Sequence, residues 1–92
     1  MNLPQKNIQK CNALISKRLL EMPDNHLFHY AKRQMEFIEG KLQVDGTLKS
    51  DDYDNVFIGL MCVRELKGID DEFCNAVFAM TTSIIPKDYK PY

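Results

Sequence analysis

The longest uninterrupted apolar run in the chain covers residues 56 to 63 and lies between segments that carry many charges. A run of eight residues suits either a buried strand or the middle of a buried helix. The flanking residues favour a helix, because Ser50 and the acids after it can cap a first turn, and Gly68 can follow a basic last turn. We therefore predict one helix over residues 51–67. Because it is apolar on nearly every side, we expect it to be the most buried helix.

Hydrophobic residues at helical spacing predict three further helices. Pro4 suits the first turn of a helix, while Pro23 and Pro86 each end one, because the residue before a proline leaves the helical region. The predicted ranges are 4–21, 25–43 and 71–85, and residues 86–92 form a short tail. A chain of 92 residues suits a single domain. The short connections predict an all-α fold, a small antiparallel four-helix bundle in which the third helix is enclosed by the others.

The balance of charges argues against nucleic acid as a partner. The chain has 12 lysine and arginine residues and 13 aspartate and glutamate residues, and its sequence shows no basic stripe or nucleic-acid motif. The N-terminal residues lack the apolar core of a signal peptide, and no apolar stretch is long enough to span a bilayer. We therefore expect a soluble cytoplasmic protein that does not enter membranes.

The cysteine and histidine residues show no pattern typical of a disulfide framework or a metal site. Cys11, Cys62 and Cys74 are odd in number and widely spaced, so we interpret them as reduced core residues. His26 and His29 can share one helix face, but no third ligand is evident. The sequence also lacks a glycine-rich phosphate loop and a Ser/His/Asp arrangement. It therefore predicts no metal, no cofactor and no enzymatic activity.

Two runs of acidic residues stand at the predicted starts of the third and fourth helices. Acids complement the positive end of a helix dipole, which explains these runs without any ligand. In an antiparallel bundle the runs lie at opposite poles, so they cannot form one acid–base pair. They can instead orient a positively charged protein partner. On exposure and charge alone, the candidate partner-binding residues are Asp51, Asp52, Asp54, Asp70, Asp71, Glu72 and Tyr89.

Two aromatic residues of the second predicted helix leave two interpretations open. Tyr30 and Phe37 lie seven residues apart, slightly beside the main apolar seam of residues 25–43. They either widen the buried face or remain partly exposed as aromatic anchors for a partner.

Three segments of the sequence resemble a known protein family. They are residues 31–38, 59–66 and 71–73, and the likeness extends from about residue 14 to residue 85. The chain resembles the small all-helical immunity proteins of bacterial type VI secretion effectors, which neutralise toxins that degrade NAD(P). The resemblance implies a cytoplasmic inhibitor that binds a cognate toxin domain and occludes its dinucleotide site, without a cofactor or turnover. It implies no particular inhibitory residue, since no contact motif of the family can be matched here.

Two other classes of function remain open from the sequence alone. The first is a non-catalytic helical adaptor or regulator that acts through protein–protein contacts, for instance as a homodimer. The second is a small enzyme or metal protein that uses His26, His29 or a cysteine. A toxin gene beside this one favours immunity, whereas stoichiometric bound metal favours the second class.

Overall fold

The computed structural model describes residues 3–87 and residue 89, and every regular element in this part of the chain is a helix. The α-helices are α1 (Leu3–Glu21), α2 (His26–Lys41), α3 (Ser50–Tyr53), α4 (Ile58–Met61) and α5 (Asp71–Ser83), and a π-helix, η1 (Cys62–Leu66), continues α4. The prediction of an all-α fold is therefore confirmed. None of the helices in the described part is long and apolar enough to cross a membrane.

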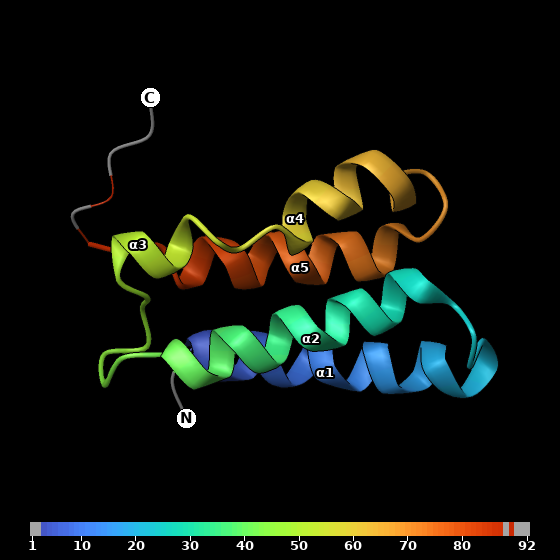
Figure 1. Cartoon of the computed structure of the whole chain (residues 1–92), viewed down its shortest axis with the longest axis horizontal. Helices are drawn as coiled ribbons and strands as arrows, with labels where there is room; N and C mark the ends of the chain where they lie inside the picture. Colours follow the sequence, from blue (N-terminus) through green and yellow to red (C-terminus); the bar gives the residue numbers. More distant parts are fainter. Residues whose placement is uncertain (1–2, 88, 90–92) are drawn as a thin grey trace.

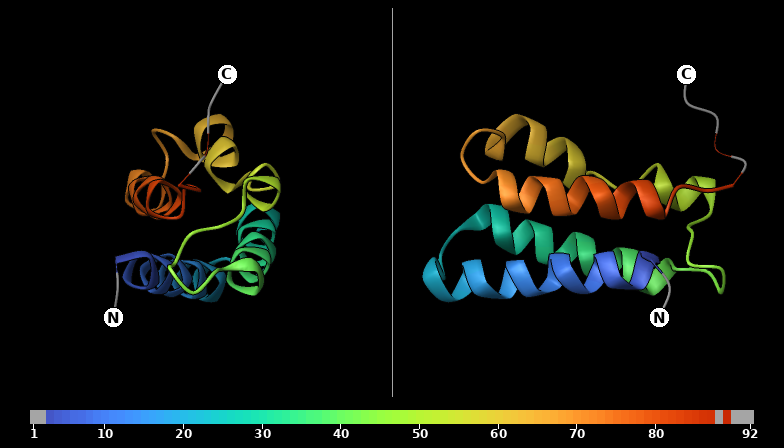
Figure 2. Two further views of the ribbon diagram at one scale, coloured as in Figure 1. Left: turned by 90° about the vertical axis from the view of Figure 1, so that its left-hand side faces the viewer. Right: turned by 180° about the vertical axis from the view of Figure 1, so that it is seen from behind.

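The helices surround one core in two layers. Figure 1 and Figure 2 show α1 and α2 in one layer and α4, η1 and α5 in the other. Each layer contacts the other, because α1 packs against α5 and α2 packs against α4. The Asn7 side chain, near the start of α1, donates to the carbonyl of Ala79 at 3.3 Å, near the end of α5. Arg18, near the end of α1, binds Asp70 just before α5, so these two helices run in opposite directions.

The core between the layers contains apolar side chains from every helix except α3, together with Leu48 and Ile84 outside the helices. The rings of Phe28 on α2 and Phe73 on α5 pack edge to face, with 5.1 Å between their centroids and 63° between their planes. This geometry is one that aromatic pairs prefer. Among the described residues no polar or charged side chain is buried. Stability therefore depends on apolar packing in the core and on polar contacts around its edge.

The helices predicted over residues 4–21, 25–43 and 71–85 correspond to α1, α2 and α5, with ends that differ by at most two residues. Local features mark the start of α2 and the end of η1. Asn25 caps α2 by accepting a hydrogen bond from the backbone N–H of Leu27 at 2.9 Å. Gly68 has a φ of 84°, the left-handed conformation that favours glycine after a last helical turn.

The segment predicted as one helix over residues 51–67 is divided in the structure. It consists of α3, a non-helical stretch at residues 54–57, and α4 with η1. It is not enclosed either, because Phe57, Leu60 and Val63 are 45%, 49% and 52% exposed. The prediction of one continuous helix that is the most buried in the fold is therefore wrong. The buried side chains of the segment are Ile58, Met61, Cys62 and Leu66.

A side chain from α2 explains why a new helix begins at Ile58. The first N–H groups of a helix have no partner within the helix. Here Oε1 of Gln34 accepts hydrogen bonds from the N–H groups of Phe57 at 2.7 Å and Ile58 at 3.2 Å. Nε2 of Gln34 also donates to the carbonyl of Asn55 at 3.4 Å. Gln34 thus supplies to α4 the cap that Phe57 cannot supply.

The π-helical turn of η1 decides which residues at the end of this segment reach the core. The N–H of Lys67 donates to the carbonyl of Cys62 at 2.8 Å, which is the bond from residue i+5 to residue i that defines a π turn. An α-helical turn would close one residue earlier and rotate the following side chains. In the wider turn Leu66 is buried and Glu65 is exposed. In this turn the Glu65 carboxylate is exposed to water, which avoids the cost of burying a charge.

An ion pair joins the end of α1 to the start of α5. Nε and Nη2 of Arg18 lie 2.8 and 3.1 Å from the two carboxylate oxygens of Asp70. Nη2 also donates to Glu72 at 2.9 Å. Both side chains of the Arg18–Asp70 pair are largely shielded from water, which strengthens their attraction. The hydrogen bond from Arg18 lowers the pKa of Asp70, and a bond from the N–H of Phe73 adds to this effect.

The Arg18–Asp70 pair predicts a pH dependence of stability. In the unfolded chain the pKa of an aspartate is about 3.9, and in the folded state the pKa of Asp70 is lower. The stabilisation is therefore complete above the unfolded value and lost as the pH falls through the folded value. We expect Arg18→Ala to lower the free energy of unfolding at neutral pH by about 2 kcal/mol. The free energy of unfolding of this variant, measured by urea denaturation at a series of pH values, should also fall less steeply as the pH is lowered.

The control for this prediction is Arg33→Ala, because Arg33 has no ion pair with any residue that the structure describes. We expect this variant to keep the original acid dependence and to change stability by less than about 0.5 kcal/mol. Equal losses in the two variants would contradict the role of the Arg18–Asp70 pair.

The capping role of Gln34 predicts a second stability effect. Gln34→Ala leaves the N–H groups of Phe57 and Ile58 without this acceptor, so it should lower the free energy of unfolding by about 1 kcal/mol. Amide hydrogen exchange should also become faster at these two positions. Gln34→Glu keeps the acceptor oxygen and should lose less stability. Gln9→Ala makes the same change on an exposed face of α1 and should have little effect on either measurement. Unchanged exchange in Gln34→Ala would contradict the cap.

Candidate functional site

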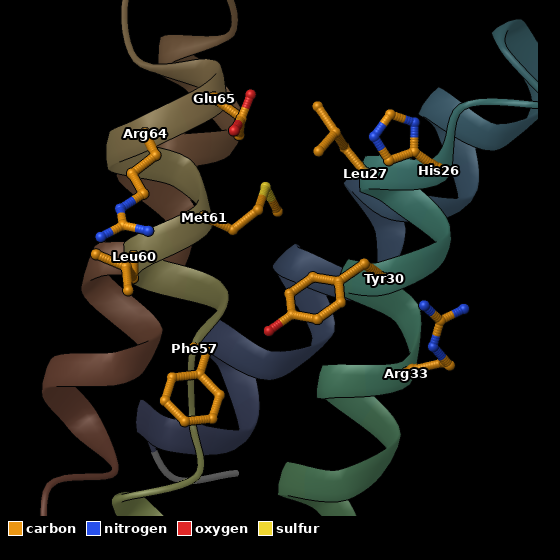
Figure 3. Close-up of a pocket in the computed structure, with 9 residues that line it drawn as sticks. All are labelled: His26, Leu27, Tyr30, Arg33, Phe57, Leu60, Met61, Arg64 and Glu65. Carbon is orange, nitrogen blue, oxygen red and sulfur yellow. The ribbon is translucent and has the colours of Figure 1, made fainter.

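A groove with a volume of about 420 Å³ lies between α2 and the α4–η1 segment (Figure 3). The wall on α2 is one helix face, because its lining residues follow the spacing of successive turns. The wall on the other side begins at the stretch that Gln34 holds and ends in the π turn. The groove is lined by His26, Leu27, Tyr30 and Arg33 from α2, and by Phe57, Leu60, Met61, Arg64 and Glu65 from the opposite wall.

The middle of the groove is apolar. Figure 3 shows Leu27 and Tyr30 on α2 and Met61 on α4 pointing toward one another across it. Met61 belongs to the core, and Leu27 and Tyr30 are partly buried against the core, so these side chains form a floor that is continuous with the interior. Phe57 and Leu60 stand at the edge with about half of their surface in water. The groove therefore offers apolar surface that the described residues of the chain leave uncovered.

The outer sides of the groove carry positive charge. Arg33 on α2 and Arg64 on η1 lie on opposite flanks (Figure 3). Neither guanidinium has an ion pair with a described residue, and Glu65 is the one carboxylate among the lining residues. Two unpaired cations beside an apolar centre resemble the composition of protein interfaces, in which arginine and aromatic residues are enriched. The arrangement suits recognition of another protein rather than a chemical reaction.

The structure places the predicted acidic residues at the two ends of the molecule, apart from the groove lining. Asp51, Asp52 and Asp54 lie in and just after α3, at the end opposite to the first residues of α5 (Figure 1). Asp51 and Asp54 are exposed, and Asp52 is partly exposed. The two runs are therefore separate, as expected. Their role in binding a partner remains a prediction.

The acidic residues at the start of α5 make contacts within the chain. Asp70 caps the helix and binds Arg18, and Glu72 binds the same guanidinium. Oδ1 of Asp71 accepts a hydrogen bond from the N–H of Gly68 at 2.8 Å. These contacts give all three carboxylates a structural role at this corner, in agreement with the helix-dipole explanation. If these carboxylates also bind a partner, as predicted, they do so in addition to their contacts within the chain.

Tyr89 contacts the chain at the end of the molecule that contains α3. Its ring packs edge to face on that of Tyr53, with 4.9 Å between the centroids. The Tyr53 hydroxyl donates to the carbonyl of Thr81 at 3.2 Å, which joins α3 to α5. Burial, together with the nearby Tyr89, raises the pKa of Tyr53. The rest of the predicted tail beyond Lys87, at positions 88 and 90–92, lies outside the described residues.

The three cysteines are free and buried, so the prediction that they are core residues is confirmed. Burial raises the pKa of Cys11 to about 11, and it also raises the pKa values of Cys62 and Cys74. The thiolate is the reactive form of cysteine, and these thiols stay protonated near neutral pH. Their chemistry in the folded protein is therefore that of small apolar side chains.

The two histidines lie in different surroundings. Nε2 of His29 lies 2.6 Å from the carbonyl oxygen of Pro23, so this nitrogen carries the hydrogen and donates it. His26 instead lines the groove. Residues 3–87 and 89 contain no group of three or more His, Cys, Asp or Glu side chains that could hold a metal ion. The prediction that the chain uses no metal is left to direct measurement.

Sequence reasoning missed most of the groove because it assigned residues 56–63 entirely to the core. The available signal was the length of the run, since eight successive apolar or glycine residues give more apolar surface than one buried helix face requires. The run does not show which of its faces is exposed. The sequence left open whether Tyr30 is a core residue or an exposed anchor for a partner. In the structure Tyr30 is partly buried against the core and also lines the groove.

Comparison with known proteins adds one result. A family model with the description Tsi6 matches residues 4–85 of the chain. The matched region contains both walls of the groove and the corner that Arg18 and Asp70 hold together. No curated protein and no solved structure matches the chain.

Proposed function

Because the chain belongs to the Tsi6 family of type VI secretion immunity proteins, we propose that it protects its bacterium by binding and inhibiting a cognate toxin domain. The match over residues 4–85 carries this proposal, and it confirms the resemblance predicted from the sequence. Tsi6 is a family of immunity proteins and not of enzymes. The chain therefore acts by binding, for which it needs a stable fold and a complementary surface but no catalytic group.

We infer further that the cognate toxin degrades NAD(P) and that the chain occludes its dinucleotide site. The support is the resemblance of residues 31–38, 59–66 and 71–73 to immunity proteins that act against such toxins. Such a toxin attacks the NAD(P) of the cytoplasm, so its inhibitor must act there as well. Inhibition by occlusion also agrees with a chain whose exposed features are an apolar groove and charged surfaces.

The decisive experiment is growth of a bacterium that produces the toxin domain encoded beside this gene. Without the present protein, growth should stop and cellular NAD(P) should fall. Production of both proteins should restore growth and preserve the NAD(P) pool. An unrelated toxin with another target serves as the control and should not be neutralised. Cellular NAD(P) is measured by an enzymatic cycling assay during the first hour, before secondary effects of cell death.

The possible outcomes separate the two parts of the proposal. Rescue without NAD(P) loss in the unprotected cells would keep the immunity function and reject the proposed toxin class. Failure of the protein to rescue cells from a toxin that is shown to be active would contradict the immunity function for this pair.

We also propose that the acidic residues of α3 and the loop after it assist association with the toxin. Exposed charges at the edge of an interface change mainly the association rate. Changing Asp51, Asp52 and Asp54 together to lysine should therefore slow association several-fold at low salt and reduce its salt dependence, with little change in dissociation. Stopped-flow binding at several salt concentrations measures this effect. Unchanged association kinetics would contradict a role of these acids in binding the toxin, and only their interaction with the dipole of α3 would remain.

A further inference from the structure

We propose that the groove between α2 and the α4–η1 segment is the surface that binds the toxin domain. In this proposal the toxin presents an apolar side chain that enters over Tyr30 and Met61, with Leu60 at the edge. Carboxylates on either side of it meet Arg33 and Arg64. The inference rests on the proposed function, because it takes the occupant to be the cognate toxin. It adds the location of the interface and the chemistry of the toxin segment that fits it.

Uncovered apolar surface is the first argument. Phe57 and Leu60 are about half exposed although they belong to the most apolar run of the sequence. Both line the same groove, and its floor is formed by side chains that already pack on the core. Other exposed apolar residues exist, such as Leu20 on α1, but Leu20 does not line this groove. Exposed apolar patches of this kind often mark protein–protein interfaces. The residues that contribute most of the binding energy are typically those that become fully buried at the centre of such a patch.

The charges around the apolar centre specify the partner. Arg33 and Arg64 lie on the two flanks, and within the described part of the chain neither forms an ion pair. A partner that covers the groove must satisfy both guanidinium groups or leave them poorly hydrated, which is unfavourable. Carboxylates satisfy them best, because an arginine can bind a carboxylate with two hydrogen bonds. The matching toxin segment is therefore apolar at its centre and acidic at its sides.

The groove is also held in place before any partner arrives. Gln34 ties α2 to the beginning of α4 through hydrogen bonds with Asn55, Phe57 and Ile58. At the other end, the π turn fixes Leu66 in the core and leaves Arg64 and Glu65 on the surface. A surface that is already ordered loses less entropy when it binds. This property favours the tight binding that protection from a toxin requires.

The test measures binding of the purified cognate toxin domain to variants of the full chain by biolayer interferometry. Leu60→Glu places a charge at the apolar edge of the groove and should raise the Kd about 30-fold or more. Leu60 is half exposed, so the variant should still fold, which circular dichroism and thermal melting check. The matched control is Leu20→Glu, the same change at a residue that is 85% exposed on α1. It should bind within about twofold of the original chain.

A second pair of variants tests the charges. Changing Arg33 and Arg64 together to glutamate should raise the Kd about tenfold or more, and the loss should shrink as salt increases. Lys32→Glu is the control for this change, because Lys32 is the neighbour of Arg33 but lies on the side of α2 that faces α1. The control should bind within about twofold of the original chain.

The outcomes distinguish failure of this inference from failure of the proposed function. If the original chain binds the toxin and the groove variants bind equally well, the immunity function stands and the groove is rejected. Loss of binding only in the lysine variant of Asp51, Asp52 and Asp54 would likewise move the interface to α3. A homodimer of the original chain that Leu60→Glu separates would assign the groove to a second copy instead. If the original chain does not bind an active cognate toxin, the proposed function itself fails.

Discussion

The hydrogen bonds of Gln34 are the contact on which the geometry of the candidate site depends. They connect α2 to a stretch of chain more than 20 residues later, where α4 begins. A helix can begin wherever its first N–H groups find acceptors. Because the acceptor comes from α2, the start of α4 is fixed in position and rotation relative to that helix. The same contact therefore selects the face of the apolar run that enters the core and the face that remains in the groove.

This selection has an energetic cost that the rest of the fold offsets. Complete burial of a leucine or phenylalanine side chain contributes roughly 1.5–3 kcal/mol, and Leu60 and Phe57 forgo about half of that contribution. The edge-to-face pair of Phe28 and Phe73 and the ion pair of Arg18 lie on other elements and do not involve the exposed face. Much of the stability therefore comes from residues away from the exposed edge of the groove. Phe57 and Leu60 can therefore stay half exposed without loss of the fold.

The sequence predicts those parts of the fold that depend on local patterns. The seam of α2 is regular, with charged residues between its apolar positions, so periodicity alone identifies its buried face. Over residues 56–63 every position is apolar or glycine, so the pattern contains no information about which face is buried. The cap of α4 and the π turn depend on tertiary contacts and lie beyond local reasoning. The all-α class was therefore predictable, whereas the division of residues 51–67 was not.

The candidate site shows the same limit for charge. The acidic residues are adjacent in sequence and were found easily, and those at the start of α5 have contacts within the chain that a dipole argument anticipates. Half of α2, two loops and the helices α3 and α4 separate Arg33 from Arg64 in the sequence, so only the folded chain places them beside one groove. The net charge of −1 does not reveal that positive and negative side chains lie on different faces of the protein, because it is only the sum of all charges. In the proposed complex, one toxin domain meets both the acidic end and the groove with its two arginines, and selectivity comes from their relative placement rather than from any single residue.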